Sequence, residues 1–230
     1  MTTNRNPEPG SGLYLISAYP QGTAEWRADR AGKATGSKAN CITAEGRTKG
    51  AEAVTRRDYR FQLVAERMSG SSMEESFVSK EMAWGTEQEP FARMAFEALT
   101  GEIVEEAGFL YRPDMPIGCS LDGFTGNRRG IFEAKCPKMA THIEYLLANR
   151  IPPAYVDQLS HNLWVTGCEY VDFCSFDPRW PEALQLFHVR AMRNEFDLKG
   201  YEAKLLQFVG EVDALEMQLL ARAMKLKVAA

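Results

Sequence analysis

Two acidic residues and a lysine stand close together in the middle of the chain, on either side of a short turn. Asp122 precedes a basic, glycine-bearing turn at residues 126–130, and the short apolar run after the turn carries Glu133 and Lys135. This pattern predicts a β-hairpin, in which residues two apart on one strand point to the same side. Glu133 and Lys135 would then share a face, and Asp122 would face Glu133 across the hairpin.

These residue types suit one kind of chemistry. Two carboxylates held a few ångströms apart repel each other unless a cation lies between them, and carboxylate oxygens are the ligands that Mg²⁺ and Mn²⁺ prefer. A lysine beside such an ion can orient or deprotonate a water molecule and stabilise charge that develops on a phosphate. The Asp…Glu-x-Lys pattern therefore suits metal-assisted phosphodiester hydrolysis. A Glu-x-Lys pair is also common as an ion pair on a solvated hairpin, so this stretch alone leaves both interpretations open.

The whole chain has the composition of one globular domain. It has 230 residues, of which 45% are hydrophobic and 25% are charged, which suits a single core. We expect the polar residues 1–12 to form a disordered tail and residues 13–230 to form a single domain with a helical C-terminal region. No apolar run approaches the roughly 20 residues that span a bilayer, and the N-terminus lacks the layout of a signal peptide, so we expect a cytoplasmic protein.

The charge and the cysteines exclude several other classes. The five cysteines are odd in number and show no Cys-x-x-Cys spacing, which argues against zinc, an iron–sulfur cluster and a disulfide framework. The three histidines are scattered and are interpreted as ordinary packed residues. A net charge of −4 argues against a protein that coats DNA, which usually has a basic excess. A nuclease needs only a local basic channel and remains open.

The apolar periodicity predicts helices and strands in an α/β order, with a central mixed β-sheet flanked by helices. We expect Pro90 to kink or break its helix near Glu89, because proline lacks a backbone donor and clashes with the preceding turn. The apolar stripe of the last helix indicates core or subunit packing. The expected helices are 23–30, a helix start at 34–40, 50–70, 77–99, 139–148, 154–165 and 195–226; the expected strands are 13–18 (an edge strand or docked arm), 103–104, 109–111, the hairpin, 170–176 and 186–192.

Two further groups of polar residues could belong to a site. The helix start at Thr35 and Ser37, with Arg30 and Lys38 nearby, could bind an anion through free N–H groups, or could be an ordinary capped helix with solvated cations. Glu89 and its neighbour at position 87 either form a solvated acidic patch or direct a carboxylate at the metal site.

Five blocks, taken together and in this order, resemble the bacteriophage lambda exonuclease family, the YqaJ-like viral recombinases within the restriction-endonuclease-like nucleases. Each block is weak alone, but chance agreement of all five is improbable. The first block runs from Gln-Gly at 21–22 through Trp26 to Arg30-Ala-Gly and Thr35-Gly-Ser, and the second is Ala-Trp-Gly-Thr-Glu-Gln-Glu at 83–89, continuing to Thr100-Gly. The third is Cys-Ser-Leu-Asp-Gly at 119–123, and the fourth is Glu-Ala-Lys-Cys-Pro at 133–137. The fifth is Ala-Tyr-Val-Asp-Gln at 154–158, continuing to Trp-Val-Thr at 164–166.

The resemblance implies a fold and an activity. The fold would be a restriction-endonuclease-like core, making residues 13–230 a single nuclease domain. The activity would be that of a Mg²⁺-dependent 5′–3′ exonuclease that degrades one strand of linear double-stranded DNA to 5′-mononucleotides. The remaining 3′ single strand would pass to a single-strand annealing protein for phage-type recombination. The resemblance also implies a homotrimeric ring around the DNA, in the cytoplasm of a bacterial host cell.

The resemblance further implies roles for individual residues. Asp122 and Glu133 would bind metal with the backbone carbonyl of Ala134, and Glu89 would complete the acidic shell of a site for two Mg²⁺ ions, with Mn²⁺ as an alternative. Lys135 would position or activate the attacking water.

Four more residues take their roles from the same resemblance. Gln158 would orient the water or a metal-bound group from its helix. Arg30 and Ser37 would hold the 5′-terminal phosphate, and Tyr155 would pack near the substrate strand.

Other functions remain as alternatives. A structure-selective endonuclease on the same core would cut circular DNA, whereas an exonuclease needs a free end. A nuclease of CRISPR adaptation would usually need a cysteine cluster that this sequence lacks. A non-catalytic DNA-binding relative is disfavoured by the intact Asp122, Glu133 and Lys135. A metabolic α/β enzyme would need a glycine-rich phosphate loop or a nucleophile motif, and neither is found.

Overall fold

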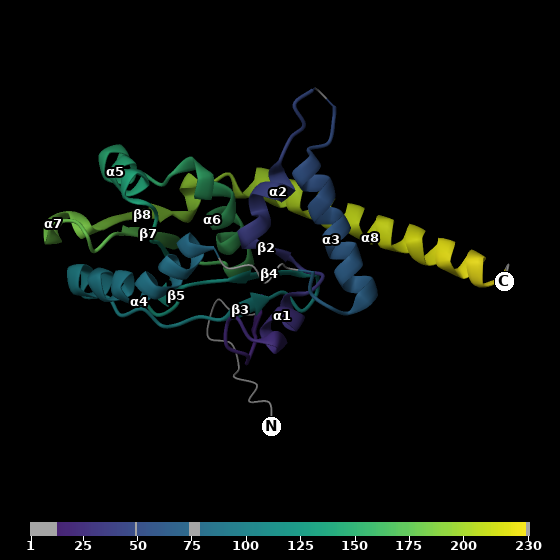
Figure 1. Ribbon diagram of the computed structural model, residues 1–230, viewed down its shortest axis with the longest axis horizontal. Coiled ribbons are helices and arrows are strands. Elements are labelled where there is room, and N and C mark those ends of the chain that lie inside the picture. Colours follow the sequence, from purple (N-terminus) through teal and green to yellow (C-terminus); the bar gives the residue numbers. More distant parts are fainter. Residues whose placement is uncertain (1–12, 49, 74–78, 229–230) are drawn as a thin grey trace.

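Helices surround two four-stranded mixed β-sheets in the part of the chain that this computed structural model describes, residues 13–48, 50–73 and 79–228 (Figure 1). The predicted tail at 1–12 lies outside the described residues, as does the start of the helix expected from residue 77. The predicted α/β class with mixed sheets is confirmed, although the strands form two sheets and not one.

The first sheet has the strand order β1-β3-β4-β2. Strand β1 (Leu15–Ile16) pairs antiparallel with β3 (Phe109–Tyr111), which confirms an edge strand near the start of the chain. Strand β2 (Ala34–Thr35) pairs parallel with β4 (Ile117–Ser120). This pairing brings the turn that follows β2 beside the end of β4, although some 80 residues separate them in the chain.

The second sheet has the order β5-β6-β7-β8 and contains the predicted hairpin. Gly123 stands opposite Phe132 in the antiparallel ladder between β5 (Gly123–Thr125) and β6 (Gly130–Lys135). Strand β6 is parallel to β7 (Tyr170–Phe176), and β7 is antiparallel to β8 (Leu186–Met192). Every residue of β7 is buried, as expected for a strand with neighbours on both sides and helices on its faces.

Most helices begin and end near the predicted residues. The hydroxyl of Thr23 caps the first helix by accepting a hydrogen bond from the backbone N–H of Trp26 (3.2 Å), and the last helix runs past the body of the protein (Figure 1). The helices are α1 (Ala24–Arg30), η1 (Gly36–Lys38), α2 (Ala39–Thr43), α3 (Val54–Ser69), α4 (Lys80–Thr100), α5 (Met139–Ala148), α6 (Pro153–Thr166), α7 (Glu182–Gln185), η2 (Arg193–Glu195) and α8 (Leu198–Val228).

Three local predictions need correction. Of the kink or break expected at Pro90, the break does not occur: helix α4 continues through this residue, because Ala92 and Phe96 are fully buried and tertiary packing outweighs the single lost backbone bond. Residues 103–104 form no strand; only the next residue pairs, as an isolated bridge with Phe124. Thr35 occupies the N-cap position of η1, as expected, but its side chain makes no capping hydrogen bond; its hydroxyl lies 3.4 Å from that of Ser37.

The core lies between the sheets and the long helices. Leu205, Phe208 and Val212 of α8 are fully buried, and the ring of Phe208 stacks on that of Tyr59 from α3 with 5.4 Å between centroids. This part of α8 confirms the predicted core packing. None of the described helices is long and apolar enough to cross a membrane.

Candidate active site

Asp122 is placed by the hairpin, one residue before β5. Its Oδ2 accepts a hydrogen bond from the backbone N–H of Ala134 (2.8 Å). Because Gly123 pairs with Phe132, the next position of the ladder sets Asp122 opposite Glu133, as the sequence predicted.

Glu133 is held by three donors. Lys135 Nζ donates to its Oε1, Gln158 Nε2 donates to the same oxygen (2.6 Å) and Asn162 Nδ2 donates to Oε2 (3.3 Å). Gln158 and Asn162 are four residues apart on α6 and so lie on one helix face. Gln158 was predicted at the site and Asn162 was not, although the four-residue spacing of Asn162 from Gln158 was a usable signal.

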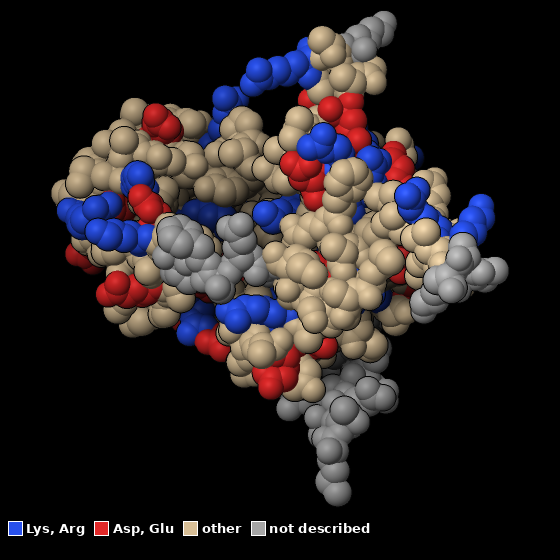
Figure 2. Space-filling model, turned by 45° about the vertical axis from the view of Figure 1, so that its right-hand side comes forward, with Lys and Arg blue, Asp and Glu red and all other residues tan. Residues whose placement is uncertain are grey.

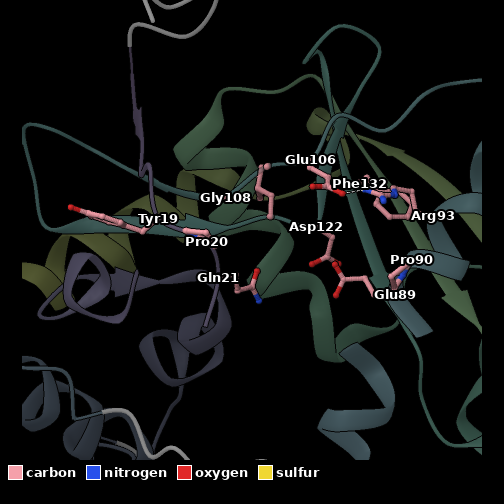
Figure 3. Close-up of a pocket in the computed structure, with 12 residues that line it drawn as sticks. Tyr19, Pro20, Gln21, Glu89, Pro90, Arg93, Glu106, Gly108, Asp122 and Phe132 are labelled. Atoms are coloured by element: carbon pink, nitrogen blue, oxygen red, sulfur yellow. Dashed lines mark hydrogen bonds and ion pairs between the residues drawn. The ribbon is translucent and has the colours of Figure 1, made fainter. Parts of the chain in front are cut away.

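Glu89 enters the site from α4. Its carboxylate and that of Asp122 point toward each other in a cleft of about 330 Å³ (Figure 3). Pro20 and Gln21 from the N-terminal segment line the other side of this cleft. Glu87 is exposed, so the acidic-patch interpretation holds for Glu87 while Glu89 faces the site.

The three carboxyl groups share a site that disfavours their charged forms. Burial raises the pKa of Glu133, although Lys135 opposes the shift. Burial also raises the pKa of Asp122, again against Lys135. Burial and then the negative charge of Asp122 raise the pKa of Glu89. Burial alone would lower the pKa of Lys135, but Glu133 and Asp122 raise it, so the lysine stays protonated.

The donor set fits a divalent cation. Burial raises the pKa values of Glu89 and Asp122, and the charge of Asp122 adds to the shift of Glu89. One lysine cannot neutralise three neighbouring carboxylates, so a cation among them would stabilise their ionised forms. Hard oxygen ligands are what Mg²⁺ and Mn²⁺ require. Among the described residues, no three acidic, histidine or cysteine side chains are already gathered as ligands of one ion. Glu133 is engaged by Lys135 and by Gln158.

A second polar cluster lies next to the acidic one. Arg30, the last residue of α1, is only 6% exposed. Its Nη1 donates to Ser120 Oγ (2.8 Å) and its Nη2 to Ser37 Oγ (3.4 Å), and its guanidinium lies over the ring of Trp26, 4.4 Å from the centroid. The structure thus brings together Arg30 and Ser37 as predicted, and adds Ser120. Because Ser120 is two residues before Asp122, the two clusters adjoin.

Asn162 lies between the two clusters. Its Nδ2 contacts Glu133, and its Oδ1 is buried without a hydrogen-bond partner among the described residues. A Cβ atom added at Gly36 would lie 2.3 Å from that Oδ1. The absence of a side chain at Gly36 therefore lets the turn that carries Ser37 pack directly against Asn162.

Tyr155 is in the first turn of α6, beside the lysine. Lys135 Nζ lies 5.4 Å from the centroid of its ring, which places Tyr155 at the site as predicted.

The two arginines of the hairpin turn lie at the opposite end of β6. Arg128 pairs with Glu105, and Arg129 pairs with Glu169 (2.6 Å), which accounts for both without a role in the site.

The fold and the acidic centre define an α/β enzyme with a nuclease-type site. The chain belongs to the YqaJ-like viral recombinase family, whose domain matches residues 25–169. This finding confirms the resemblance inferred from the five sequence blocks. A comparison with curated proteins finds none that matches.

Solved structures extend the match beyond that domain. The chain is similar to the alkaline exonuclease LHK-Exo from Laribacter hongkongensis, with 33% identity and a TM-score of 0.79 over 89% of this chain and 100% of that chain. The match to the structure of LHK-Exo in complex with dAMP has the same values. A phage related exonuclease from Haemophilus somnus 129PT shares the fold, with 17% identity and a TM-score of 0.60 over 83% of this chain and 96% of that chain. The chain is thus homologous to alkaline exonucleases.

Proposed function

We propose that this protein is a divalent-metal-dependent 5′–3′ exonuclease that degrades one strand of linear double-stranded DNA to 5′-mononucleotides. One observation carries the proposal: a cluster of the buried Arg30 with two serines adjoins a lysine-bearing acidic centre at Ser120 and Asp122. The first suits a terminal phosphate and the second suits hydrolysis of a phosphodiester. The dAMP complex of the relative LHK-Exo supports DNA as the substrate class.

The arginine–serine cluster would set the register of cleavage. Arg30, Ser37 and Ser120 offer a guanidinium and two hydroxyls to a 5′-terminal phosphate, and charge-assisted hydrogen bonds of this kind are strong and directional. Holding the terminal phosphate in one place would present the next phosphodiester to the acidic centre at each step. We propose that the phosphate bound here is the 5′-terminal one, which would give the enzyme its preference for a 5′ end.

Lys135 would act as a cation at the reacting phosphate. Because Glu133 and Asp122 keep it protonated, it can orient a water molecule and stabilise developing negative charge, but it is poorly suited to remove a proton. Gln158 fixes the carboxylate of Glu133 through its 2.6 Å hydrogen bond, and Tyr155 packs beside the lysine where the substrate strand would pass.

The acidic residues would hold the metal. We propose Asp122, Glu133, Glu89 and the backbone carbonyl of Ala134 as ligands of two Mg²⁺ ions, with Mn²⁺ as an alternative. Such ions supply stabilisation of the attacking and leaving oxygens in phosphoryl chemistry.

The wider role rests on the family. A recombinase family and an exonuclease activity together favour a product with a 3′ single strand, which a single-strand annealing protein would use in the cytoplasm of a bacterial host. A homotrimeric ring around the DNA would allow processive digestion by a protein of net charge −4. Figure 2 shows Lys and Arg side chains around a hollow on one face, which supplies the local basic surface that DNA needs.

The decisive experiment uses linear duplex DNA with a 5′ phosphate on one end only, digested in Mg²⁺ beside a closed circular duplex. We expect the phosphorylated strand to shorten from its 5′ end and release mononucleotides while the circle stays intact. Cutting of the circle would favour a structure-selective endonuclease. No cleavage in Mg²⁺ or Mn²⁺ would favour a non-catalytic DNA-binding relative.

A further inference from the structure

A second cavity, of about 300 Å³, lies beside the active site, and its lining includes three cationic side chains, the carboxylate of Glu81 and one aromatic ring. Trp84 and Lys80 line it from the first half of α4, Lys138 from the segment that follows β6, and Arg179 from the loop after β7. The mechanism proposed above uses none of these four side chains. Trp84 is partly exposed, and basic groups around an accessible aromatic ring are typical of sites for single-stranded nucleic acid.

The arginine of this cavity is held in a fixed position. Asp177 is fully buried and accepts hydrogen bonds from Arg179 Nε and Nη2 (2.7 Å each) and from the backbone N–H of Arg179 (3.0 Å). The guanidinium consequently lies over the ring of Trp84, 5.0 Å from its centroid. Within the described residues Nη1 makes no hydrogen bond, and the side chain is 45% exposed. A ligand can therefore reach a guanidinium that is already oriented.

Lys138 offers a second available charge. It pairs with Glu81 at 3.0 Å, but the two side chains are 74% and 58% exposed. Exposed ion pairs contribute little net free energy, so a phosphate can replace the Glu81 carboxylate at small cost.

The cavity is continuous with the catalytic strand. Cys136, which lines it, directly follows Lys135.

We propose that this cavity binds a nucleotide of a single DNA strand next to the reacting phosphate, with its base on Trp84 and its phosphate on Arg179 and Lys138. The proposal rests on the proposed exonuclease function, since a duplex that is digested at its end must part into single strands there. A purely structural pair of Arg179 and Asp177 would require neither an aromatic ring under the guanidinium nor an exposed Lys138 at the same cavity.

The test measures binding without hydrolysis. A fluorescein-labelled oligothymidylate is titrated with the full chain in EDTA, and fluorescence anisotropy gives the Kd. We expect Trp84→Ala to weaken binding by roughly fivefold to tenfold, as for the loss of one stacked base, and Lys138→Ala by about threefold with a shallower dependence on salt. Arg129→Ala is the matched control, because Arg129 is also exposed and paired with a carboxylate but lies at the far end of the hairpin.

A second readout guards against misfolding. The chain has four tryptophans, and stacking of a base on Trp84 should quench part of their fluorescence when oligothymidylate binds; Trp84→Phe should fold normally and lose that quenching. The proposal would be overturned if the Trp84→Ala and Lys138→Ala variants bound oligothymidylate as tightly as the Arg129→Ala variant. It would also be overturned if the fluorescence quenching persisted in Trp84→Phe. Hydrolysis in Mg²⁺ is assayed separately. A wild-type chain that binds oligothymidylate with these signatures but cuts no DNA would refute the exonuclease function, while the proposal of a single-strand binding site would still hold.

Discussion

The two halves of the active site are built in different ways. The acidic centre comes mainly from one hairpin, in which Asp122, Glu133 and Lys135 fall within fourteen consecutive residues. The arginine–serine cluster joins Arg30 to Ser120, which are 90 residues apart in the chain. The first half is local and negatively charged; the second is assembled over a long range and carries a buried cation.

This difference suggests that the acidic centre carries out the reaction and that the arginine–serine cluster positions the DNA end. Side chains on one strand keep their mutual geometry whatever happens elsewhere, which suits groups that act on a single phosphate. The cluster around Arg30 depends on the parallel pairing of β2 with β4, so its position relative to the acidic centre is set by the whole fold. Variants of the first half should therefore abolish turnover, and variants of the second should change which DNA ends are used.

The largest effect should follow loss of the hairpin charges. Lys135→Ala should lower kcat by about 10²- to 10³-fold, the loss expected when a group that stabilises transition-state charge is removed. Glu133→Gln, which keeps the side-chain volume, should lower it at least as much. Initial rates on 5′-phosphorylated duplex DNA measure the effect, and circular dichroism shows whether the fold is intact. Substantial activity in either variant would argue against this assignment.

The acidic centre should also make the protein sensitive to pH. Glu89, Asp122 and Glu133 have raised pKa values in the folded state, and metal binding requires their ionised forms, so activity should fall by roughly tenfold per pH unit below those values. The optimum should therefore lie on the alkaline side, and the measurement is a pH–rate profile in Mg²⁺.

The same shifts predict an opposite trend for stability without metal. A carboxyl group whose folded-state pKa is raised stabilises the fold fully below its unfolded value, about pH 4. That contribution is lost as the pH rises through the raised folded-state pKa. Mg²⁺ should accordingly raise Tm more at about pH 8 than at about pH 5. Asp122→Asn should reduce this difference, and a Tm response to Mg²⁺ that is equal at both pH values would contradict the shared acidic site.

The acidic centre could be predicted from the sequence, and the arginine–serine cluster could be predicted only in part. The turn at 126–130 and the apolar runs around it define the hairpin, and β7 and β8 have the predicted bounds because turn signals flank them. Asn162 was missed although it lies one helical turn after Gln158, because only the packing of α6 shows that this second turn also reaches Glu133. Ser120 was missed because its partner Arg30 is distant in sequence.

The wrong predictions have the same origin. Propensity alone ends a helix near Pro90, but packing of Phe96 against the second sheet holds α4 together. The run at 103–104 is apolar enough for a strand, yet Val104 instead packs beside Ala92 and Phe96 in that core. Local signals cannot show which surface a segment will meet.

A variant of the arginine–serine cluster should have a moderate effect on which DNA ends the enzyme uses. Arg30→Ala should reduce the preference for a 5′-phosphate over a 5′-hydroxyl by about 10- to 100-fold, as expected for loss of hydrogen bonds from a charged donor. Digestion rates of two duplexes that differ only at the 5′ end give the ratio. Arg27→Ala is the matched control, since Arg27 lies in the same last turn of α1 but is exposed. An unchanged preference in Arg30→Ala would move the phosphate site elsewhere.

The smallest effect should come from the residue that joins the two halves. Asn162→Ala removes one 3.3 Å hydrogen bond to Glu133 and opens space beside Gly36, so we expect a threefold to tenfold loss of kcat, in line with the worth of roughly one hydrogen bond. If Asn162 aligns the acidic centre with the arginine–serine cluster, the preference for 5′-phosphate should fall as well. A variant that loses kcat but keeps the full preference would show that Asn162 serves Glu133 alone, and that the two halves are aligned by the backbone of β2 and β4.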